Sequence, residues 1–168
     1  MSAWQPFKPR AILQLLTAKG IDYVLVGGYA AVLHGSSRVT QDIDICFATD
    51  STNLAALGKV LVDLNARLFG VDEEVPFVPD ERTLARVELL TLDTDLGKLD
   101  LMTHPAGAPS YAKLRANADA YDLGDFVVRV ASVHDLIAMK RAAGRPKDIA
   151  DVAELEAIER LRRTRPAS

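Results

Sequence analysis

The stretch Tyr23–Phe47, YVLVGGYAAVLHGSSRVTQDIDICF, decides which fold is expected of this chain. Its first four residues are apolar strand formers, and they end at a glycine pair, Gly27 and Gly28. The next six residues favour a short helix that stops at a further glycine. Residues 42–47 alternate polar and apolar side chains, which predicts a second strand. The side chains that this strand is expected to bury are Ile43, Ile45 and Phe47.

Helices and strands are expected to alternate along the rest of the chain as well. Helical periodicity or capping signals predict helices at residues 9–19, 52–68, 132–143 and 146 to about 163, with a helical turn at 111–117. Further strands are predicted at residues 86–92, 98–102 and 125–130, after an irregular proline-containing stretch at 75–79. The pattern indicates an α/β (α+β) architecture in one domain, 1–168, with a core at about 20–130 and C-terminal helices at about 132–163.

The composition excludes several classes of protein. With 168 residues, 49% of them apolar and 26% charged, the chain is long enough for a real core and too apolar for disorder. Its single cysteine, Cys46, excludes an intrachain disulfide framework and a multi-cysteine zinc site. The longest apolar stretch is too short for a membrane span, and the first residues lack the apolar run of a signal peptide. A soluble, cytoplasmic protein that does not enter a membrane is expected, and its oligomeric state is not indicated.

Charge is distributed unevenly. The formal net charge of −3 does not fit a protein that coats nucleic acid through many phosphate contacts. Residues 1–139 contain 12 basic and 18 acidic residues, whereas residues 140–168 contain 8 and 5. The chain is therefore expected to have an acidic body and a basic C-terminal segment.

Two motifs in the opening stretch are candidates for chemistry. Gly27 and Gly28, between a strand and a helix, allow a ligand phosphate to approach backbone N–H groups, although a turn also uses glycine for steric reasons alone. Asp42 and Asp44 lie two residues apart on the predicted strand, so both side chains point to one face, roughly 6.5–7 Å apart. Such a pair can hold Mg²⁺ beside nucleotide phosphates, or be the solvated face of an edge strand.

A third carboxylate follows in a later strand. Asp100 stands between Leu99 and Leu101, which are expected to be buried, so its side chain lies on the opposite face. A carboxylate among apolar strand residues is costly unless it is solvated, paired or bound to a metal. If this strand lies beside the strand at 42–47, three carboxylates converge, but the periodicity does not establish that adjacency.

Taken together, these motifs resemble the nucleotidyltransferase superfamily with the polymerase-beta-like fold. The string GGYAAVLHGSSRVTQDIDI, residues 27–45, is similar to the bacterial branch that contains AbiEii-type and MenT-like toxins. The later strings DLIAMK, residues 135–140, and KDIADVAEL, residues 147–155, resemble the same branch. The similarity covers roughly residues 10–160 and implies a mixed twisted sheet flanked by helices, with a C-terminal helical pair.

The resemblance also implies roles for single residues. It makes Asp42 and Asp44 metal ligands and Asp100 a third carboxylate that helps to bind metal and to activate the acceptor hydroxyl. It makes Gly27 and Gly28 the phosphate-holding turn. Most members have Gly-Ser at this turn, so here a phosphate contact must come from the backbone or from an arginine.

Four further residues match the family pattern and have ordinary explanations beside the functional one. Arg38 can clamp a phosphate or be a surface arginine, and Thr40 can orient the aspartate strand or simply favour a strand. Lys140 can meet triphosphate charge, or complement the dipole at a helix C-terminus. Asp148 matches a late acidic motif, yet an acid is expected in the first turn of a helix that begins at Pro146.

The function expected on this basis is Mg²⁺-dependent transfer of a nucleoside monophosphate from an NTP such as ATP to an acceptor hydroxyl. By resemblance the acceptor is RNA, such as a tRNA 3′ end, and the protein is the toxin of a toxin–antitoxin or phage-defence pair with a cognate antitoxin. The basic run Arg160, Arg162, Arg163 and Arg165 favours RNA, although a solvated helix end explains it too. The alternatives are transfer to a small molecule, as in antibiotic-modifying relatives, transfer to a partner protein, and a non-catalytic nucleotide-binding module.

Overall fold

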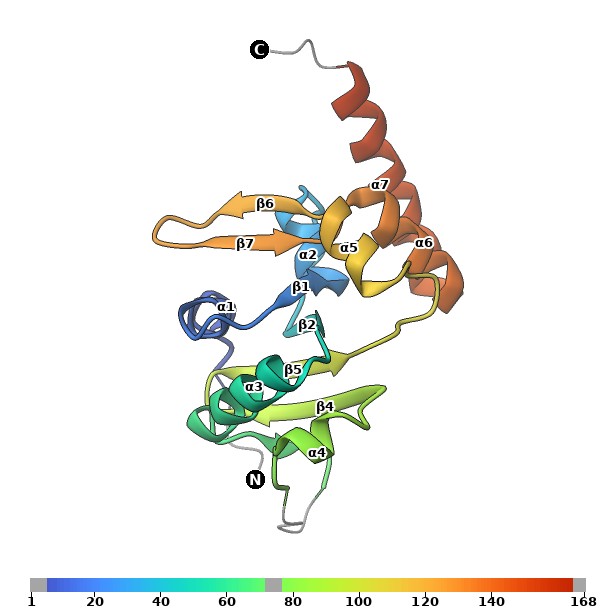
Figure 1. Ribbon diagram of the computed structural model, residues 1–168. Coiled ribbons are helices and arrows are strands. Elements are labelled where there is room, and N and C mark those ends of the chain that lie inside the picture. The colour runs from blue at the N-terminus through green and yellow to red at the C-terminus, as the bar shows by residue number, and fades with distance from the viewer. Residues whose placement is uncertain (1–5, 72–76, 165–168) are drawn as a thin grey trace.

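The computed structural model describes residues 6–71 and 77–164 (Figure 1). Residues 75 and 76 of the proline-containing stretch and Arg165 of the basic run lie outside the described residues. One mixed sheet forms the centre, with strand order β3-β4-β5-β2-β1-β7-β6. Its strands are β1 (Tyr23–Val26), β2 (Asp42–Phe47), β3 (Arg67–Leu68), β4 (Leu89–Thr94), β5 (Gly97–Met102), β6 (Asp119–Asp122) and β7 (Val127–Val130).

The pair β1–β2 is joined by a short connection, whereas the pair β2–β5 is joined by a long one. β1 and β2 run antiparallel, joined by the short helix α2 (Gly27–Leu33), whereas β2 and β5 run parallel and are separated by residues 48–96. A parallel pair of this kind needs a long crossover, which α3 (Ser51–Asp63), α4 (Glu81–Leu84) and the β3–β4 pair supply.

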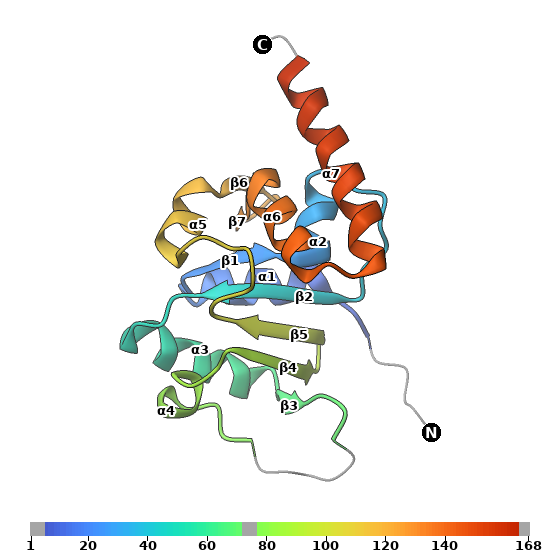
Figure 2. The same ribbon diagram turned by 90° about the vertical axis from the view of Figure 1, so that its right-hand side faces the viewer.

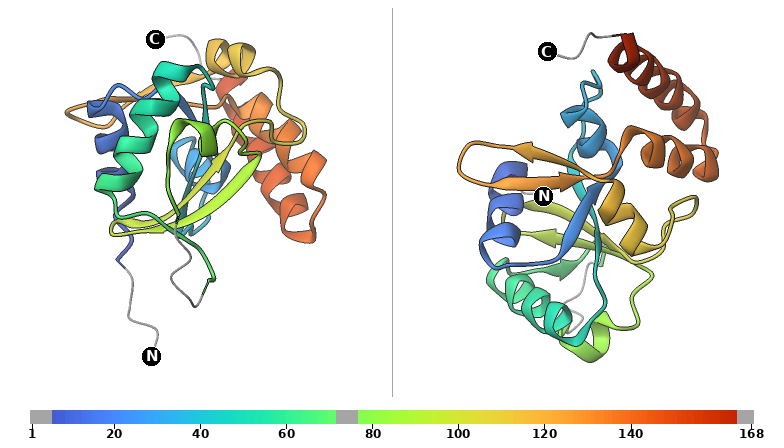
Figure 3. Two further views of the ribbon diagram at one scale, coloured as in Figure 1. Left: turned by 60° about the horizontal axis from the view of Figure 1, so that its bottom comes forward. Right: turned by 45° about the horizontal axis from the view of Figure 1, so that its top comes forward.

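Helices cover both faces of the sheet (Figure 3). α1 (Pro9–Ala18) and α3 lie on one face, and α6 (Val133–Ala143) and α7 (Pro146–Thr164) lie on the other side. α5 (Tyr111–Asn117) packs beside β1, and α2 contacts both β2 and α6. The buried core contains the expected Ile43, Ile45 and Phe47 of β2. It also contains Ile12, Leu13 and Leu16 of α1 and Leu54, Leu57 and Leu61 of α3.

Several boundaries differ from the sequence expectation for identifiable reasons. The helix predicted at 52–68 ends at Asp63, because Asn65 adopts φ 52°, outside the helical region, and residues 67–68 then pair with β4 as β3. α2 begins at Gly27 rather than at Tyr29. Besides β3, two short elements were not predicted, α4 and β6, and β6 is largely exposed and so lacks a clear apolar pattern. No helix within the described ranges has the length and apolarity needed to cross a membrane.

The α6–α7 junction has the capping predicted from its sequence. The Ser132 hydroxyl accepts a hydrogen bond from the backbone N–H of Asp135 at the start of α6. Gly144 ends α6 in the left-handed conformation, with φ 63°, and Pro146 begins α7. This tight turn brings the first turns of α7 back alongside α6 (Figure 2).

Candidate active site

The adjacency on which the three-carboxylate hypothesis depends is present in the sheet. β2 pairs in parallel with β5, and Asp44 is the register partner of Asp100. Leu99 and Leu101, on either side of Asp100, are fully buried on the opposite face. Alternation along the strand therefore forces the Asp100 side chain to the same side as Asp42 and Asp44.

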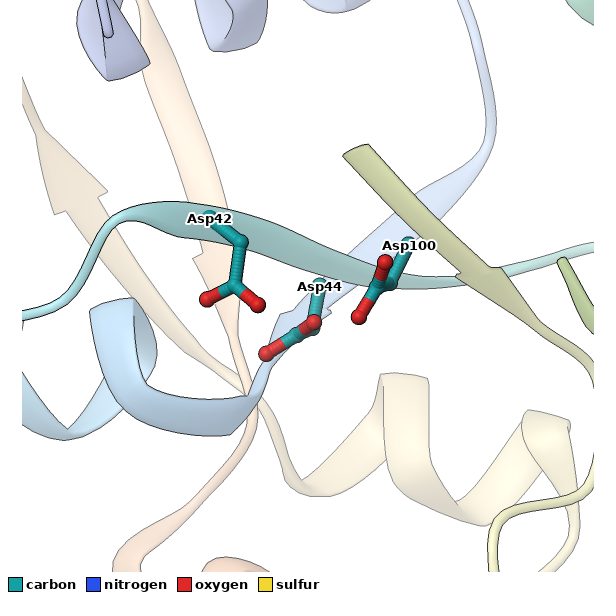
Figure 4. A group of neighbouring side chains, drawn as sticks. All are labelled: Asp42, Asp44 and Asp100. Carbon is teal, nitrogen blue, oxygen red and sulfur yellow. The ribbon is translucent and has the colours of Figure 1, made fainter. Parts of the chain in front are cut away.

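The three carboxyl groups form a compact cluster. One oxygen from each of Asp42, Asp44 and Asp100 lies within 4.8 Å of the others, and Figure 4 shows the three carboxyl groups extending to one side of the strands. Asp100 Oδ1 is buried and has no hydrogen-bond partner among the described residues. An ionised cluster with such an oxygen is unfavourable unless a cation neutralises it.

The pKa of Asp44 also reflects the cost of placing several carboxylates together in a partly buried site. Burial, first of all, and the negative charges of Asp42 and Asp100 together raise the pKa of its carboxyl to about 8. The nearby Lys140 ammonium acts in the opposite direction but does not compensate. A bound cation would remove this conflict, because it favours the ionised carboxylate.

Gly27 makes room for the cluster. Its φ of +72° favours glycine, and a Cβ at this position would lie 2.7 Å from Asp44 Cγ. At Gly28 a Cβ would lie 3.2 Å from Thr40 Oγ1, a close but less severe contact. The backbone of the glycine turn thus approaches the carboxylates so closely that a side chain at Gly27 would displace Asp44.

Two neighbours hold Asp42. The Thr40 hydroxyl donates a hydrogen bond to Asp42 Oδ1 over 3.2 Å, so Thr40 fixes the carboxyl that begins β2. Lys98 Nζ lies 3.9 Å from Asp42 Oδ2 and also 4.4 Å from the centroid of the Phe69 ring. The hydrogen bond from Thr40 to Asp42 is consistent with the orienting role expected of Thr40.

An open cleft of about 1520 Å³ contains the cluster. It is large enough for a nucleotide together with part of a second substrate. The cleft is lined by these residues singled out in the sequence: Gly27, Gly28, Arg38, Thr40, Asp42, Asp44, Asp100 and Lys140. Arg145 and Lys147, from the α6–α7 turn, also line it and were not predicted. Asp148 is not among the residues that line this cleft.

Asp148 is a buried residue that contacts two basic residues of the cleft lining, Lys140 and Arg145. It is 1% exposed, and its carboxylate accepts hydrogen bonds from the backbone N–H and the guanidinium of Arg145, the shortest over 2.8 Å. The Arg145 guanidinium is the main reason that the pKa of Asp148 falls to about 2. Lys140 Nζ lies 3.5 Å from its other oxygen. Asp148 therefore binds the side chains of Arg145 and Lys140, in addition to its place in the first turn of α7.

Asp151 is an acidic residue in this region that the sequence analysis did not single out. It lies one turn after Asp148, forms an ion pair with Arg38, and accepts a hydrogen bond from Lys140 over 3.1 Å. The signal was present, because acids three residues apart on a helix share one face. What the sequence did not show is which face of α7 meets the loop that carries Arg38.

The basic run lies away from the aspartates. α7 is about 28 Å long, and its C-terminal half extends beyond the rest of the molecule (Figure 2). Arg162 donates to His34 Nδ1 and to the Tyr121 hydroxyl, each over 2.8 Å, and Arg163 pairs with Glu159. Part of the run thus serves to fasten α7 to α2 and β6.

The residues present fit a divalent cation. Hard cations such as Mg²⁺ prefer oxygen ligands and carboxylates above all. Asp42, Asp44 and Asp100 supply such oxygens at one point of the cleft. A cation bound there would give Asp100 Oδ1 the partner that it lacks among the described residues. The donor set contains no nitrogen or sulfur, which argues against a zinc or copper centre.

Comparisons with known proteins agree with this arrangement. A family model described as "Nucleotidyl transferase AbiEii toxin, Type IV TA system" matches residues 12–165. Among solved structures, the lincomycin-bound lincosamide antibiotic adenylyltransferase LnuA superposes with a TM-score of 0.62 at 20% identity, covering 92% of this chain and 99% of that one. ANT(2″)-Ia in complex with adenylyl-2″-tobramycin superposes with a TM-score of 0.52 at 17% identity, covering 94% and 96%. These likenesses show the nucleotidyltransferase fold, and no curated protein sequence matches the chain.

Proposed function

The chain belongs to the AbiEii nucleotidyl transferase family, and from this premise we propose that it moves a nucleoside monophosphate from an NTP to an acceptor hydroxyl with the help of Mg²⁺. The observation that carries this proposal is the meeting of Asp42, Asp44 and Asp100 in one cleft, with an Asp100 oxygen that has no partner among the described residues. Nucleotidyl transfer needs just such a concentration of carboxylates beside a phosphate-binding turn.

Mg²⁺ held by Asp42, Asp44 and Asp100 would neutralise charge on the triphosphate. The glycine turn offers backbone N–H groups to the phosphates, and Gly27 keeps that backbone close to Asp44. Arg38 and Lys140, which line the same cleft, supply positive charge for the phosphate oxygens. The Thr40 hydroxyl holds Asp42 through a hydrogen bond, and Asp148 forms an ion pair with Lys140.

The proposed step is a displacement at the α-phosphorus. The acceptor hydroxyl oxygen forms a bond to the α-phosphorus while the bond from that phosphorus to the oxygen bridging it to the β-phosphate breaks. Asp100 takes the hydroxyl proton, and pyrophosphate leaves with the electron pair of the broken bond. Asp100 Oδ1 has no hydrogen-bond partner among the described residues, so it is available to accept this proton.

We propose RNA, such as a tRNA 3′ end, as the acceptor, and the role of a toxin with a cognate antitoxin. The family description supports the toxin role. The exposed basic residues at the end of α7, Arg160 and Arg163, support an encounter with RNA. A reading frame for a small antitoxin-like protein beside the gene would support the pairing.

A small-molecule acceptor is the second candidate, and a specific observation favours it. The C-terminal end of α7 lies away from β2 and β5, the strands that carry the aspartates (Figure 2), whereas the cleft also has apolar lining from Phe69, Leu89 and Met102. The lincosamide and tobramycin proteins share the fold over nearly the whole chain.

The two acceptor classes are distinguished by parallel transfer assays. Purified protein is incubated with Mg²⁺, α-labelled NTPs, and either total tRNA, lincomycin or tobramycin. Label on tRNA that declines with added salt supports RNA. Arg160→Gln with Arg163→Gln should lower transfer to tRNA several-fold and leave transfer to a small molecule unchanged, because neither arginine lines the cleft. Label on lincomycin or tobramycin alone overturns the RNA proposal and retains the transfer chemistry.

A further inference from the structure

Asp151 connects the two cations that enter the cleft from different elements. Arg38 comes from the loop between α2 and β2, and Lys140 comes from α6. Both donate to the same oxygen, Asp151 Oδ2, Lys140 over 3.1 Å. The side chains of Lys140 and Asp151 are 13% and 16% exposed, so this contact is largely withdrawn from water.

The loop that carries Arg38 has a second attachment one turn further along α7. Glu154 accepts hydrogen bonds from the Ser36 hydroxyl and, over 2.8 Å, from the Ser37 hydroxyl. The backbone N–H of Arg38 in turn donates to Ser36 Oγ over 3.2 Å. The loop is therefore fixed at its start by Glu154 and at Arg38 by Asp151, which leaves the Arg38 side chain a defined position.

Asp148 cannot take over this role. Both of its oxygens accept from the Arg145 guanidinium, over 2.8 and 3.3 Å. It faces Lys140 at 3.5 Å, and the structure gives it no contact with Arg38. Among the described residues, Asp151 is the carboxylate that touches both cations.

Resting on the proposed function, we infer that Asp151 is a positioning residue for recognition of the NTP phosphates. Two cations at one end of a cleft repel each other, and long side chains without an anchor spread into solvent. Asp151 holds one N–H of each and leaves further donors of the Arg38 fork and the Lys140 ammonium for phosphate oxygens. Its carboxylate thus determines where the two positive charges meet the triphosphate.

The test compares Asp151→Asn with Glu156→Gln. Both changes remove one negative charge from α7, but Glu156 pairs with Arg141, which does not line the cleft. The probe is the set of α,β-methylene analogues of the four NTPs with Mg²⁺, titrated calorimetrically. Loss of a supporting contact of this kind lowers affinity about tenfold or more, so D151N should bind the preferred analogue about tenfold more weakly, and E156Q within about twofold of wild type. The KM for NTP should rise in parallel while kcat changes little.

Two further variants separate positioning from charge and from folding. Asp151→Glu keeps the charge and should restore most of the affinity, and Asp151→Ser serves as the neutral variant if D151N does not fold by circular dichroism. Unchanged or tighter binding by D151N overturns the inference, because Asp151 would then merely sequester the cations. A wild-type protein that binds none of the analogues contradicts the proposed function itself, whereas binding by wild type and D151N alike contradicts the inference alone.

Discussion

Asp44 and Asp100 are register partners on adjacent parallel strands, although they are separated by more than fifty residues of sequence. Their carboxyl groups lie on one side of the sheet with that of Asp42. The fold holds three like charges together where separate placement would be more stable. A protein that keeps such a conflict does so at a functional site, because any ordinary surface would relieve it.

Replacing Asp100 should therefore change activity and stability in opposite directions. Asp100→Asn removes one of the carboxylates whose charges repel one another in this cluster, so the melting temperature of the metal-free protein should rise. Nucleotidyl transfer should fall by about three orders of magnitude, because a ligand and a proton acceptor are lost together. Differential scanning fluorimetry with EDTA and a transfer assay measure the two effects. Loss of both activity and stability would instead indicate a structural role.

The metal-free protein should lose stability as the pH rises. In the unfolded chain the Asp44 pKa has its ordinary value of 3.8, and in the fold burial and the neighbouring charges of Asp42 and Asp100 raise the pKa to about 8. Between these values the unfolded state releases a proton that the folded state retains, so the contribution of Asp44 to stability is greatest below the lower pKa and declines until the upper one. Bound Mg²⁺ favours the ionised carboxylates and opposes the decline. The increase in melting temperature on adding Mg²⁺ should thus be larger at about pH 8.5 than at about pH 5, and Asp44→Asn should reduce the difference.

Gly27→Ala tests whether the glycine turn must approach Asp44. The new methyl group meets the Asp44 carboxyl, and the backbone at this position has φ +72°, a left-handed conformation in which alanine is strained. Gly20→Ala is the matched control, because Gly20 has φ +70° and no atom within 4 Å of its added Cβ. The control should lose about 1 kcal/mol from backbone strain alone. Gly27→Ala should lose more stability in urea unfolding and nearly all transfer activity, and equal effects of the two changes would contradict the role given to Gly27.

Thr40 should affect metal affinity through its hydroxyl. Thr40→Val keeps the shape but removes the donor to Asp42 Oδ1, whereas Thr40→Ser keeps the donor. We expect the valine variant to bind Mn²⁺, used as a spectroscopic probe, about tenfold more weakly, as is usual when a group that orients a ligand is lost. The serine variant should stay close to wild type. Equal affinities for valine and serine variants would show that the hydroxyl does not orient Asp42.

Short sequence patterns predicted those features of the site that depend on residues close together in the chain. The alternation in β2 and the apolar neighbours of Asp100 correctly placed these carboxylates on the face of the sheet opposite the fully buried Ile43, Ile45, Leu99 and Leu101. The Ser132 cap and the Gly144–Pro146 turn were likewise predicted from residues within a few positions of each other. In each case one short segment contains the whole signal.

Long-range pairings could not be predicted in this way. That β2 lies beside β5 follows from the crossover through α3 and β4, and the family resemblance rather than the periodicity implied it. The role of Asp151 depends on which face of α7 meets the Arg38 loop, a contact across more than a hundred residues. The early end of α3 depends on the left-handed Asn65 and on pairing of β3 with β4, which outweigh the helical pattern of residues 64–68.

The most direct test of the central claim is the fate of two labels on the same nucleotide. Purified protein is incubated with Mg²⁺, acceptor and an NTP labelled either at the α-phosphorus or at the γ-phosphorus. Nucleotidyl transfer at the aspartate cluster predicts that α-label enters the acceptor, that γ-label is found in pyrophosphate, and that both outcomes vanish in Asp44→Ala and with EDTA. Entry of γ-label into the acceptor, or equal α-labelling by wild type and Asp44→Ala, would contradict it.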